Sequence, residues 1–395
     1  MNENDIRGIA VVIDDEINDE DSNVFKLVEE IKKKKIPCVT YDSLPELDVI
    51  SHFSQVPFII LDWQLYDLEE EGVQLPDSFV ESEMKRSLEF IKKVQDDCFC
   101  PIFIFTNTDV SEVSARLKKE DLLRDDSVDM IFVKNKDELL DENLFKEIVN
   151  WVRNNSTIYT LLKWEKVYEG AKNQLFSDFY KLSRSWPKVL WDTYSDDGVN
   201  ASDELGGMIT RNLHSRMTPF SFNEDVYKKG SQVCKKELRS VLQGEKFVKR
   251  LSEDSIRAGD VFKLGNSKKP KYYINVRPDC DCISRNGEDD VNLYLLRMSD
   301  LSNVQEQNHF QKEFGNFTER TNESVIFNMF KSKTFTIKFK SVEIMAWSEI
   351  KERRVGRLIP PHITRVLQRY SFYLQREGMP RIPKEAVIDE VKNKQ

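Results

Sequence analysis

The run Ile9-Ala-Val-Val-Ile-Asp-Asp-Glu16 is a short apolar segment that ends on two adjacent acids, Asp14 and Asp15. A continuous apolar run of this length is typical of a strand buried on both faces of a parallel sheet. Three later segments repeat the pattern and end on polar residues: Pro57-Phe-Ile-Ile-Leu-Asp62, Pro101-Ile-Phe-Ile-Phe-Thr106 and Asp129-Met-Ile-Phe-Val-Lys134. Because the carboxyl ends of parallel strands converge on one crevice, the sequence predicts that these polar side chains gather there.

Helical patterns separate the apolar runs as far as residue 155. This alternation indicates an α/β domain with a doubly wound sheet. The spacing predicts a five-stranded parallel sheet, with strands at 9–13, 38–41, 58–61, 102–105 and 130–133. We therefore assign residues 1–155 to the first domain.

The rest of the chain has two other patterns. Residues 156–255 are helical and aromatic, and we expect them to link the first domain to an effector region. From residue 256 the apolar period becomes two, which predicts a small β-rich domain over residues 256–395 that closes with a basic helix. The strands of this domain are expected at 260–264, 272–276, 293–296, 325–330 and 335–344.

The composition narrows the class of protein. The chain has 395 residues, of which 39% are hydrophobic and 32% are charged, and it contains no run of 18 apolar residues, so we expect no membrane span and no membrane partner. The first residues are polar and acidic, unlike a secretory signal. Six cysteines are too few for a disulfide framework. A cytoplasmic location is the simplest expectation.

The charge is distributed unevenly. Residues 1–136 carry roughly 31 acids against 16 bases, whereas bases outnumber acids about two to one from Lys331 onward. A basic tail on an acidic protein can serve to bind a partner.

The polar residues at the predicted strand ends suggest a chemistry. Asp14, Asp15 and Asp62 would form a hard oxygen site suited to Mg²⁺. Thr106 and Lys134 could hold a phosphoryl group through a hydroxyl and an ammonium. Since close carboxylates repel one another, a divalent cation would stabilise the cluster.

These residues, in this order, resemble the receiver domain of bacterial two-component response regulators, a domain with a flavodoxin-like sheet. The resemblance covers residues 5–155, about 40% of the chain. It implies that Asp62 accepts a phosphoryl group from a sensor histidine kinase or a phosphotransfer protein. It also implies that Asp14, Asp15, Asp62 and the backbone carbonyl of Gln64 hold Mg²⁺. Thr106 would then bond to the phosphoryl group, and Lys134 would pair with Asp62.

Three positions depart from the receiver pattern. The lysine of receivers is usually followed by proline, but Lys134 is followed by Asn135. A small residue usually follows the threonine, and here it is Asn107. The aromatic switch residue normally lies three positions before the lysine, where this chain has Ile131.

The output of the protein is left open. A constitutive scaffold or a nucleic-acid binder is one alternative, because arginines such as Arg365 and Arg369 cluster on the terminal helix. A defence-system effector enzyme with its chemistry hidden in residues 200–350 is another. Cys280 and Cys282 suggest a metal site, but zinc would need two more ligands. We find no catalytic motif in the second half, and a homodimer also stays open.

Overall fold

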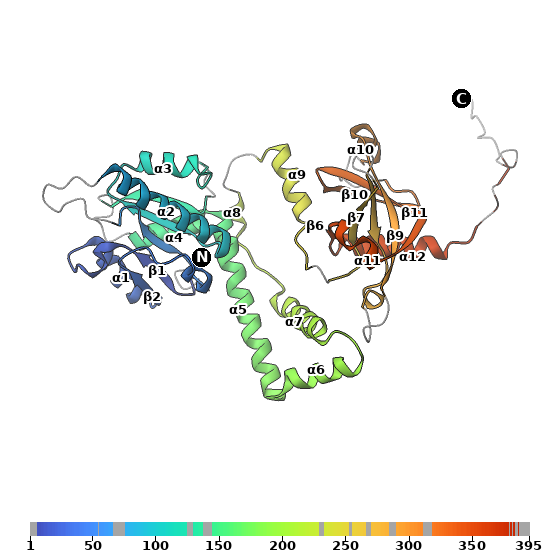
Figure 1. Cartoon of the computed structure of the whole chain (residues 1–395), viewed down its shortest axis with the longest axis horizontal. Helices are drawn as coiled ribbons and strands as arrows, with labels where there is room; N and C mark the ends of the chain where they lie inside the picture. Colours follow the sequence, from blue (N-terminus) through green and yellow to red (C-terminus); the bar gives the residue numbers. More distant parts are fainter. Residues whose placement is uncertain are drawn as a thin grey trace, which may run out of the picture. The chain divides into compact units, whose positions relative to one another are not determined.

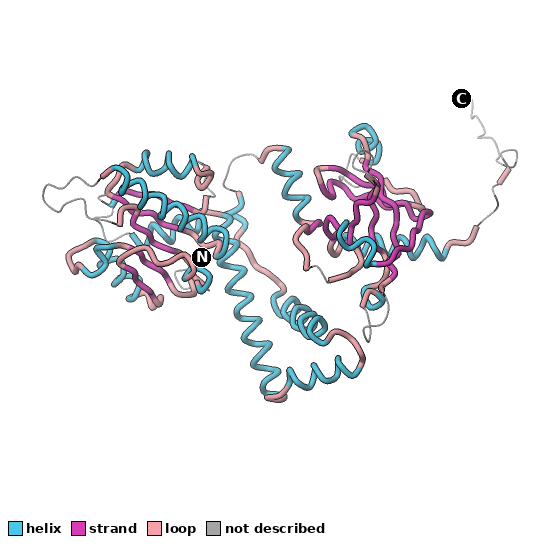
Figure 2. Tube along the Cα trace, viewed as in Figure 1, coloured by secondary structure: helices cyan, strands magenta, loops and turns pink. Residues whose placement is uncertain are grey.

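The computed structural model describes residues 6–53, 55–65, 76–124, 129–136, 144–228, 233–252, 255–265, 270–283, 290–310, 318–378, 380, 382–383 and 386. The chain divides into two compact units, which we call unit 1 (Met1–Trp186 and Gly207–Ser231) and unit 2 (Pro187–Gly206 and Gln232–Gln395). Residues 156–255, which we expected to form a separate helical segment, are shared between the two units. Figures 1 and 2 show helices and a parallel sheet in unit 1, and a second sheet in unit 2.

Unit 1 contains a five-stranded parallel sheet in the order β2-β1-β3-β4-β5. Its strands are β1 (Ala10–Ile13), β2 (Cys38–Tyr41), β3 (Ile59–Asp62), β4 (Ile102–Thr106) and β5 (Ile131–Asn135). Every residue of β1, β3 and β4 is buried, which explains why their sequences are continuous apolar runs. The predicted α/β class with a five-stranded parallel sheet is confirmed.

Helices cover both faces of this sheet. On one face, α1 (Asn23–Lys33) and α4 (Leu144–Asn154) contribute to one apolar core. On the other face, α2 (Asp77–Asp97) and α3 (Val110–Lys119) contribute to a second core. Two short 3-10 helices, η2 (Asp15–Asn18) and η3 (Val49–His52), complete the α/β part. The loops at the carboxyl ends of the strands are thereby held at one edge of a two-sided core.

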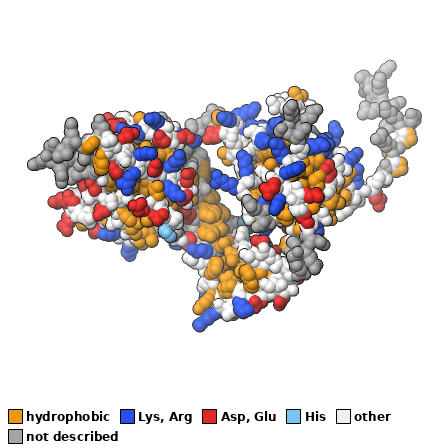
Figure 3. Space-filling view, viewed as in Figure 1, with side chains coloured by type: hydrophobic (Ala, Val, Ile, Leu, Met, Phe, Trp, Pro, Cys, Tyr) orange, Lys and Arg blue, Asp and Glu red, His pale blue; other side chains and the backbone are white. Residues whose placement is uncertain are grey.

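A long helix, α5 (Ser156–Leu182), continues directly from this α/β part. The side chain of Asn155 begins it by accepting the N–H groups of Thr157 and Ile158, at 3.0 and 3.1 Å. The Asn155 side chain also donates to the carbonyl of Asp129 just before β5, at 2.7 Å, so it fixes the start of α5 to the sheet. Figure 3 shows hydrophobic side chains exposed along α5. Three more helices follow: α6 (Trp186–Asp196), α7 (Ala201–Met217) and α8 (Glu224–Tyr227).

Unit 2 is built on a seven-stranded sheet in the order β10-β11-β9-β8-β7-β12-β6. All its pairings are antiparallel. The strands are β6 (Phe247–Val248), β7 (Asp260–Leu264), β8 (Lys271–Asn275), β9 (Asn292–Asp300), β10 (Glu323–Phe330), β11 (Lys333–Ala346) and β12 (Arg354–Leu358). The five strands predicted after residue 256 correspond to β7, β8, β9, β10 and β11. The sequence pattern missed β6, which has two residues, and β12, in which two arginines and a central glycine obscure the apolar alternation.

The two edges of this sheet meet, so the sheet curls toward a barrel. The rings of Phe247 in β6 and Phe330 in β10 stack with centroids 5.1 Å apart. The ammonium of Lys246 donates to the carbonyl of Phe327, at 3.4 Å. Helix α9 (Lys235–Gly244) packs on both β6 and β10. The contact between the edges protects strand groups that would otherwise be open to another chain.

The other helices after residue 244 are α10 (Asn303–His309), α11 (Trp347–Ile350), α12 (His362–Gln375), η5 (Asp279–Asp281) and η6 (Lys351–Arg353). Helix α12 places Ile363 and Val366 in the apolar core of the curled sheet. No helix in the described ranges combines the length and the hydropathy needed to cross a bilayer.

Candidate functional site

The three predicted acids come together at the carboxyl edge of the unit 1 sheet. Asp14 follows β1 directly and is 1% exposed, while Asp62 ends β3 and is 3% exposed. Asp15 lies beside them on the surface. Each of the three can offer a carboxylate oxygen within 4.8 Å of the others. Among the described residues, no second group of three His, Cys, Asp or Glu side chains is clustered in this way.

Backbone hydrogen bonds hold the two buried carboxylates in place. The Oδ1 atom of Asp14 accepts the N–H of Glu16 at 3.0 Å, which makes Asp14 the N-cap of η2. In the same way, Oδ1 of Asp62 accepts the N–H of Gln64 at 3.1 Å. In each carboxylate, Oδ1 therefore accepts a hydrogen bond from the loop that follows its own strand. The second oxygen, Oδ2, is left for contacts with other side chains in the crevice.

A buried lysine bridges the second oxygens of the two acids. The Lys136 Nζ atom lies 2.8 Å from Oδ2 of Asp62 and 3.1 Å from Oδ2 of Asp14. The carboxylate of Glu16 approaches the same ammonium at 3.6 Å. Lys136 is 9% exposed, so this ion pair is shielded from solvent. A buried charge of this kind is stable only when it is paired and hydrogen-bonded.

We predicted that Lys134 pairs with Asp62, and this was wrong. Lys134 instead forms an ion pair with Glu147 of α4, with 2.5 Å between Nζ and Oε2. The error arises from the end of β5, which we placed at residue 133 but which continues to Asn135. Lys134 is thus inside the strand, opposite Phe105 of β4, and Lys136 is the lysine that follows the strand end.

Burial perturbs the protonation of the site. The pKa of Asp62 is raised to about 7, mainly by burial and also by the nearby charge of Asp14, despite the lowering effect of Lys136. Burial also raises the pKa of Asp14. Burial alone would lower the pKa of Lys136, but the charges and hydrogen bonds of Asp62 and Asp14 raise it above its usual value. The lysine therefore stays charged, whereas burial makes the ionised form of the two carboxylates less favourable.

Thr106 ends β4 and is fully buried beside the end of β3. Its hydroxyl oxygen accepts the N–H of Thr108, at 2.9 Å. The Thr108 hydroxyl in turn donates to Oε1 of Gln64, at 3.1 Å. These bonds tie the loop after β4 to the loop after β3. The phosphoryl contact predicted for Thr106 and the metal contact predicted for the Gln64 carbonyl stay predictions.

The donor set suits a hard divalent cation. Mg²⁺ binds through one or more carboxylates and keeps several waters, which fits two buried acids and one on the surface. Each carboxylate oxygen has two lone pairs, so the oxygens that accept from Lys136 retain acceptor capacity for a cation. Asp14, Asp15 and Asp62 are therefore residues that could hold the metal.

The candidates in unit 2 have structural partners. Arg365 and Arg369 of α12 both pair with Glu319, and Arg369 also donates to the carbonyls of Arg320 and Glu323. Cys282 is buried, whereas Cys280 is exposed. Burial raises the pKa of the Cys282 thiol to about 11, which disfavours the thiolate that a metal would need. A nucleic-acid surface on α12 stays a prediction that these ion pairs do not favour.

No protein-family model matches the chain, and no curated protein is significantly similar to it in sequence.

Proposed function

We propose that unit 1 is a receiver-type phosphoacceptor, in which Asp62 takes a phosphoryl group with the help of Mg²⁺. The observation that carries the proposal is the bridge of Lys136 between Asp14 and Asp62, with Asp15 completing a triad of acids. The strand order 2-1-3-4-5 supports a flavodoxin-like sheet, which binds ligands at the carboxyl ends of its strands.

The site residues would divide the work as follows. A carboxylate oxygen of Asp62 attacks phosphorus, the bond from phosphorus to the donor atom breaks, and an acyl phosphate forms on Asp62. Mg²⁺, held by Asp14, Asp15 and Asp62, would neutralise the spread negative charge of the transferring group. The ammonium of Lys136, already 2.8 Å from Asp62, would move its contact to a phosphoryl oxygen.

The assignment of Lys136 changes how the receiver pattern applies. Three positions before Lys136 lies Val133, so neither this position nor Ile131 provides an aromatic switch residue. The Thr106–Thr108–Gln64 hydrogen bonds are the connection by which the site could report its state to the neighbouring loops. We also propose that the donor is a sensor histidine kinase or a phosphotransfer protein and that unit 2 provides the output.

The test is covalent labelling of the full chain. The protein is incubated with acetyl phosphate and Mg²⁺, and the adduct is located by mass spectrometry. One phosphoryl group on Asp62 is expected, and Asp62→Asn and EDTA should each abolish it. Asp109→Asn is the matched control, because Asp109 is an exposed N-cap after the neighbouring strand and asparagine also caps helices. Labelling that persists in Asp62→Asn, or wild-type protein that takes no label, would overturn the proposal.

A further inference from the structure

Unit 1 has a cavity at the opposite edge of its sheet from the acids. Gly8, just before β1, and Gln55, before β3, contribute to its wall, and α5 provides most of the remainder. The cavity volume is about 190 Å³. A cavity of roughly 150 Å³ is enough to hold benzene in another protein, so this one can hold a ring with a short substituent.

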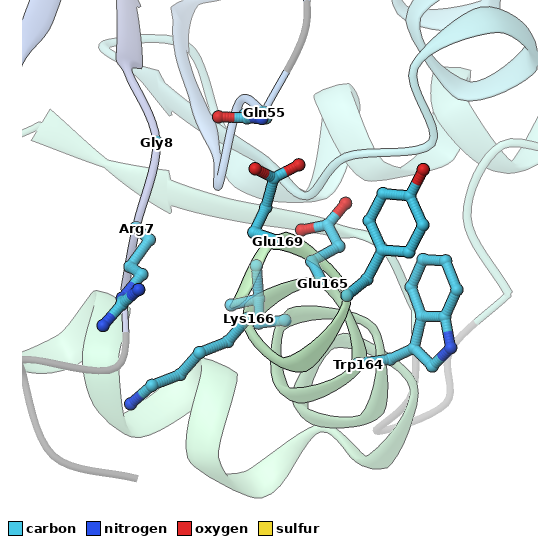
Figure 4. A pocket seen from close by; sticks show the side chains of 9 residues that line it. Arg7, Gly8, Gln55, Trp164, Glu165, Lys166 and Glu169 are labelled. Carbon is cyan, nitrogen blue, oxygen red and sulfur yellow. The ribbon is translucent and has the colours of Figure 1, made fainter. Parts of the chain in front are cut away.

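Aromatic rings and acids from successive turns of α5 line the cavity. The rings of Trp164 and Tyr168 stack with centroids 5.1 Å apart and planes 11° apart. Figure 4 shows the carboxylate of Glu169 toward Gln55, and that of Glu165 between it and the ring of Trp164. Tyr168 lines the same cavity. Stacked aromatic faces next to a carboxylate are the recognised combination for an organic cation, because both attract positive charge.

The two acids differ in their partners. Glu169 is paired with Lys172, at 2.7 Å. For Glu165, no ion pair or hydrogen bond of the carboxylate joins it to another side chain in the described part of unit 1. Burial raises the pKa of Glu165, and the charge of Glu169 raises it further. Glu165 is therefore a half-buried acid for which a cation would supply the missing counter-charge.

The basic residues of the cavity are separated from the acids. Figure 4 shows the nitrogen atoms of Arg7 and Lys166 on the side of the cavity away from the carboxylates. Gly8 makes the wall possible, because a Cβ atom there would lie 1.8 Å from the carbonyl oxygen of Gln55. The close approach of the Gly8 backbone to the Gln55 backbone thus forms the wall of the cavity that faces α5.

We propose that this cavity binds a small organic amine, with its ammonium on Glu165 and its apolar body against Trp164 and Tyr168. The cavity size favours a free amine with one ring or a short alkyl body over a peptide segment. The inference does not depend on phosphorylation, because the cavity residues lie before β1 and β3 and on α5, whereas the acids follow β1 and β3.

Calorimetry on the full chain tests the proposal with three probes of one shape: phenethylamine, 2-phenylethanol and 3-phenylpropionate. Phenethylamine should bind with one site per chain, and the alcohol and the carboxylate should bind at least about tenfold more weakly. Equal binding of the alcohol and the amine, or no binding of the amine at millimolar concentration, would overturn it. Binding of the carboxylate in preference to the amine would also overturn it, because Arg7 and Lys166 would then define the site.

Variants assign the binding to the named residues. Glu165→Gln should weaken phenethylamine binding about tenfold or more, because a hydrogen bond to a charged group is lost. Glu89→Gln, the same change on exposed Glu89 of α2, should have no effect. Trp164→Phe should retain binding and Trp164→Leu should lose it. Unchanged affinity in a folded Glu165→Gln variant would refute the site. Asp62→Asn should bind the amine normally, so failure of this inference and failure of the proposed phosphoacceptor are separable.

Discussion

The ammonium of Lys136 lies 2.8 Å from the carboxylate of Asp62, although the two residues are 74 positions apart in the chain. Both side chains are almost fully buried, so water cannot take the place of either partner in this ion pair. Any reaction at Asp62 therefore occurs in contact with this lysine. The pair also determines how the site responds to substitution, to metal and to pH.

Lys134, which lies in β5, and Lys136, which follows β5, should differ in their effect on phosphorylation. Lys136→Met should slow labelling of Asp62 by about 100-fold, since removal of one donor to developing charge has effects of this size. Lys134→Met should change the rate less than about threefold, because Lys134 pairs with Glu147 instead. Labelling rates with acetyl phosphate measure both effects, and circular dichroism checks the fold. A larger loss in Lys134→Met would refute the assignment.

The stability of the metal-free protein should depend on pH through Asp62. The folded state retains a proton on Asp62 up to about pH 7, whereas an unfolded aspartate releases it near pH 3.9. The folded state therefore binds more protons between these values, and this group makes stability fall as pH rises from about 4 to 7. The raised pKa of Lys136 does not act in this window, because lysine is protonated in both states.

Asp62→Asn should remove this part of the pH dependence. In EDTA at pH 7 we expect the variant to be more stable than the wild type by the order of 1 kcal/mol, with the difference decreasing toward pH 4. Urea unfolding at several pH values measures the difference. If the stability of the two proteins changed in parallel with pH, burial would not raise the pKa of Asp62 in the folded state.

Gly8→Ala should destabilise unit 1 by about 3 kcal/mol. The backbone of Gly8 has φ of +115°, a region that alanine rarely adopts, and the added Cβ would collide with the Gln55 carbonyl oxygen. Gly170→Ala in α5 is the matched control. Apart from the adjacent backbone of α5 itself, no atom lies within 4 Å of a Cβ at that position, so the helix should gain up to about 1 kcal/mol. Thermal unfolding should show shifts of opposite sign.

In unit 2, Asp260→Asn should cost about 3–5 kcal/mol, because it breaks a buried ion pair. Asp260 is fully buried, with Nε of Arg357 at 2.6 Å and Nη1 of Arg354 at 3.5 Å. Asp300→Asn removes an exposed pair with Lys333 and should cost less than about 1 kcal/mol. Hydrogen exchange of the β7 amides measures both. Similar protection in the two variants would show that the buried pair is not essential to the sheet.

Buried strands are the features that sequence patterns predict well. The runs ending at Asp14, Asp62 and Thr106 are apolar at every position, because each strand is covered by helices on both faces. Such runs require no knowledge of distant contacts. Local pattern also located β7 to β11, where apolar and polar residues alternate because one face of the sheet is more buried than the other.

The strand ends were less predictable, and the site depended on one of them. Val133 is the last apolar residue before both lysines, one position before Lys134 and three before Lys136, so local pattern alone could not decide which lysine reaches Asp62. The hydrogen-bond register with β4 continues to Asn135 and carries Lys136 past the edge. A shift of two residues preserves the face of the strand, which explains why both lysines fit the same sequence pattern.

Composition and periodicity determined by themselves that this chain contains a parallel α/β sheet with acids at its carboxyl edge, because burial of a strand leaves its signature in adjacent residues. Only the tertiary structure decided that Lys136 bridges Asp14 and Asp62, that the seven-stranded sheet curls until Phe247 meets Phe330, and that Trp164, Glu165 and Gly8 enclose a cavity. Each of these features joins segments distant in the chain, and contacts of that kind are set by packing of the whole fold.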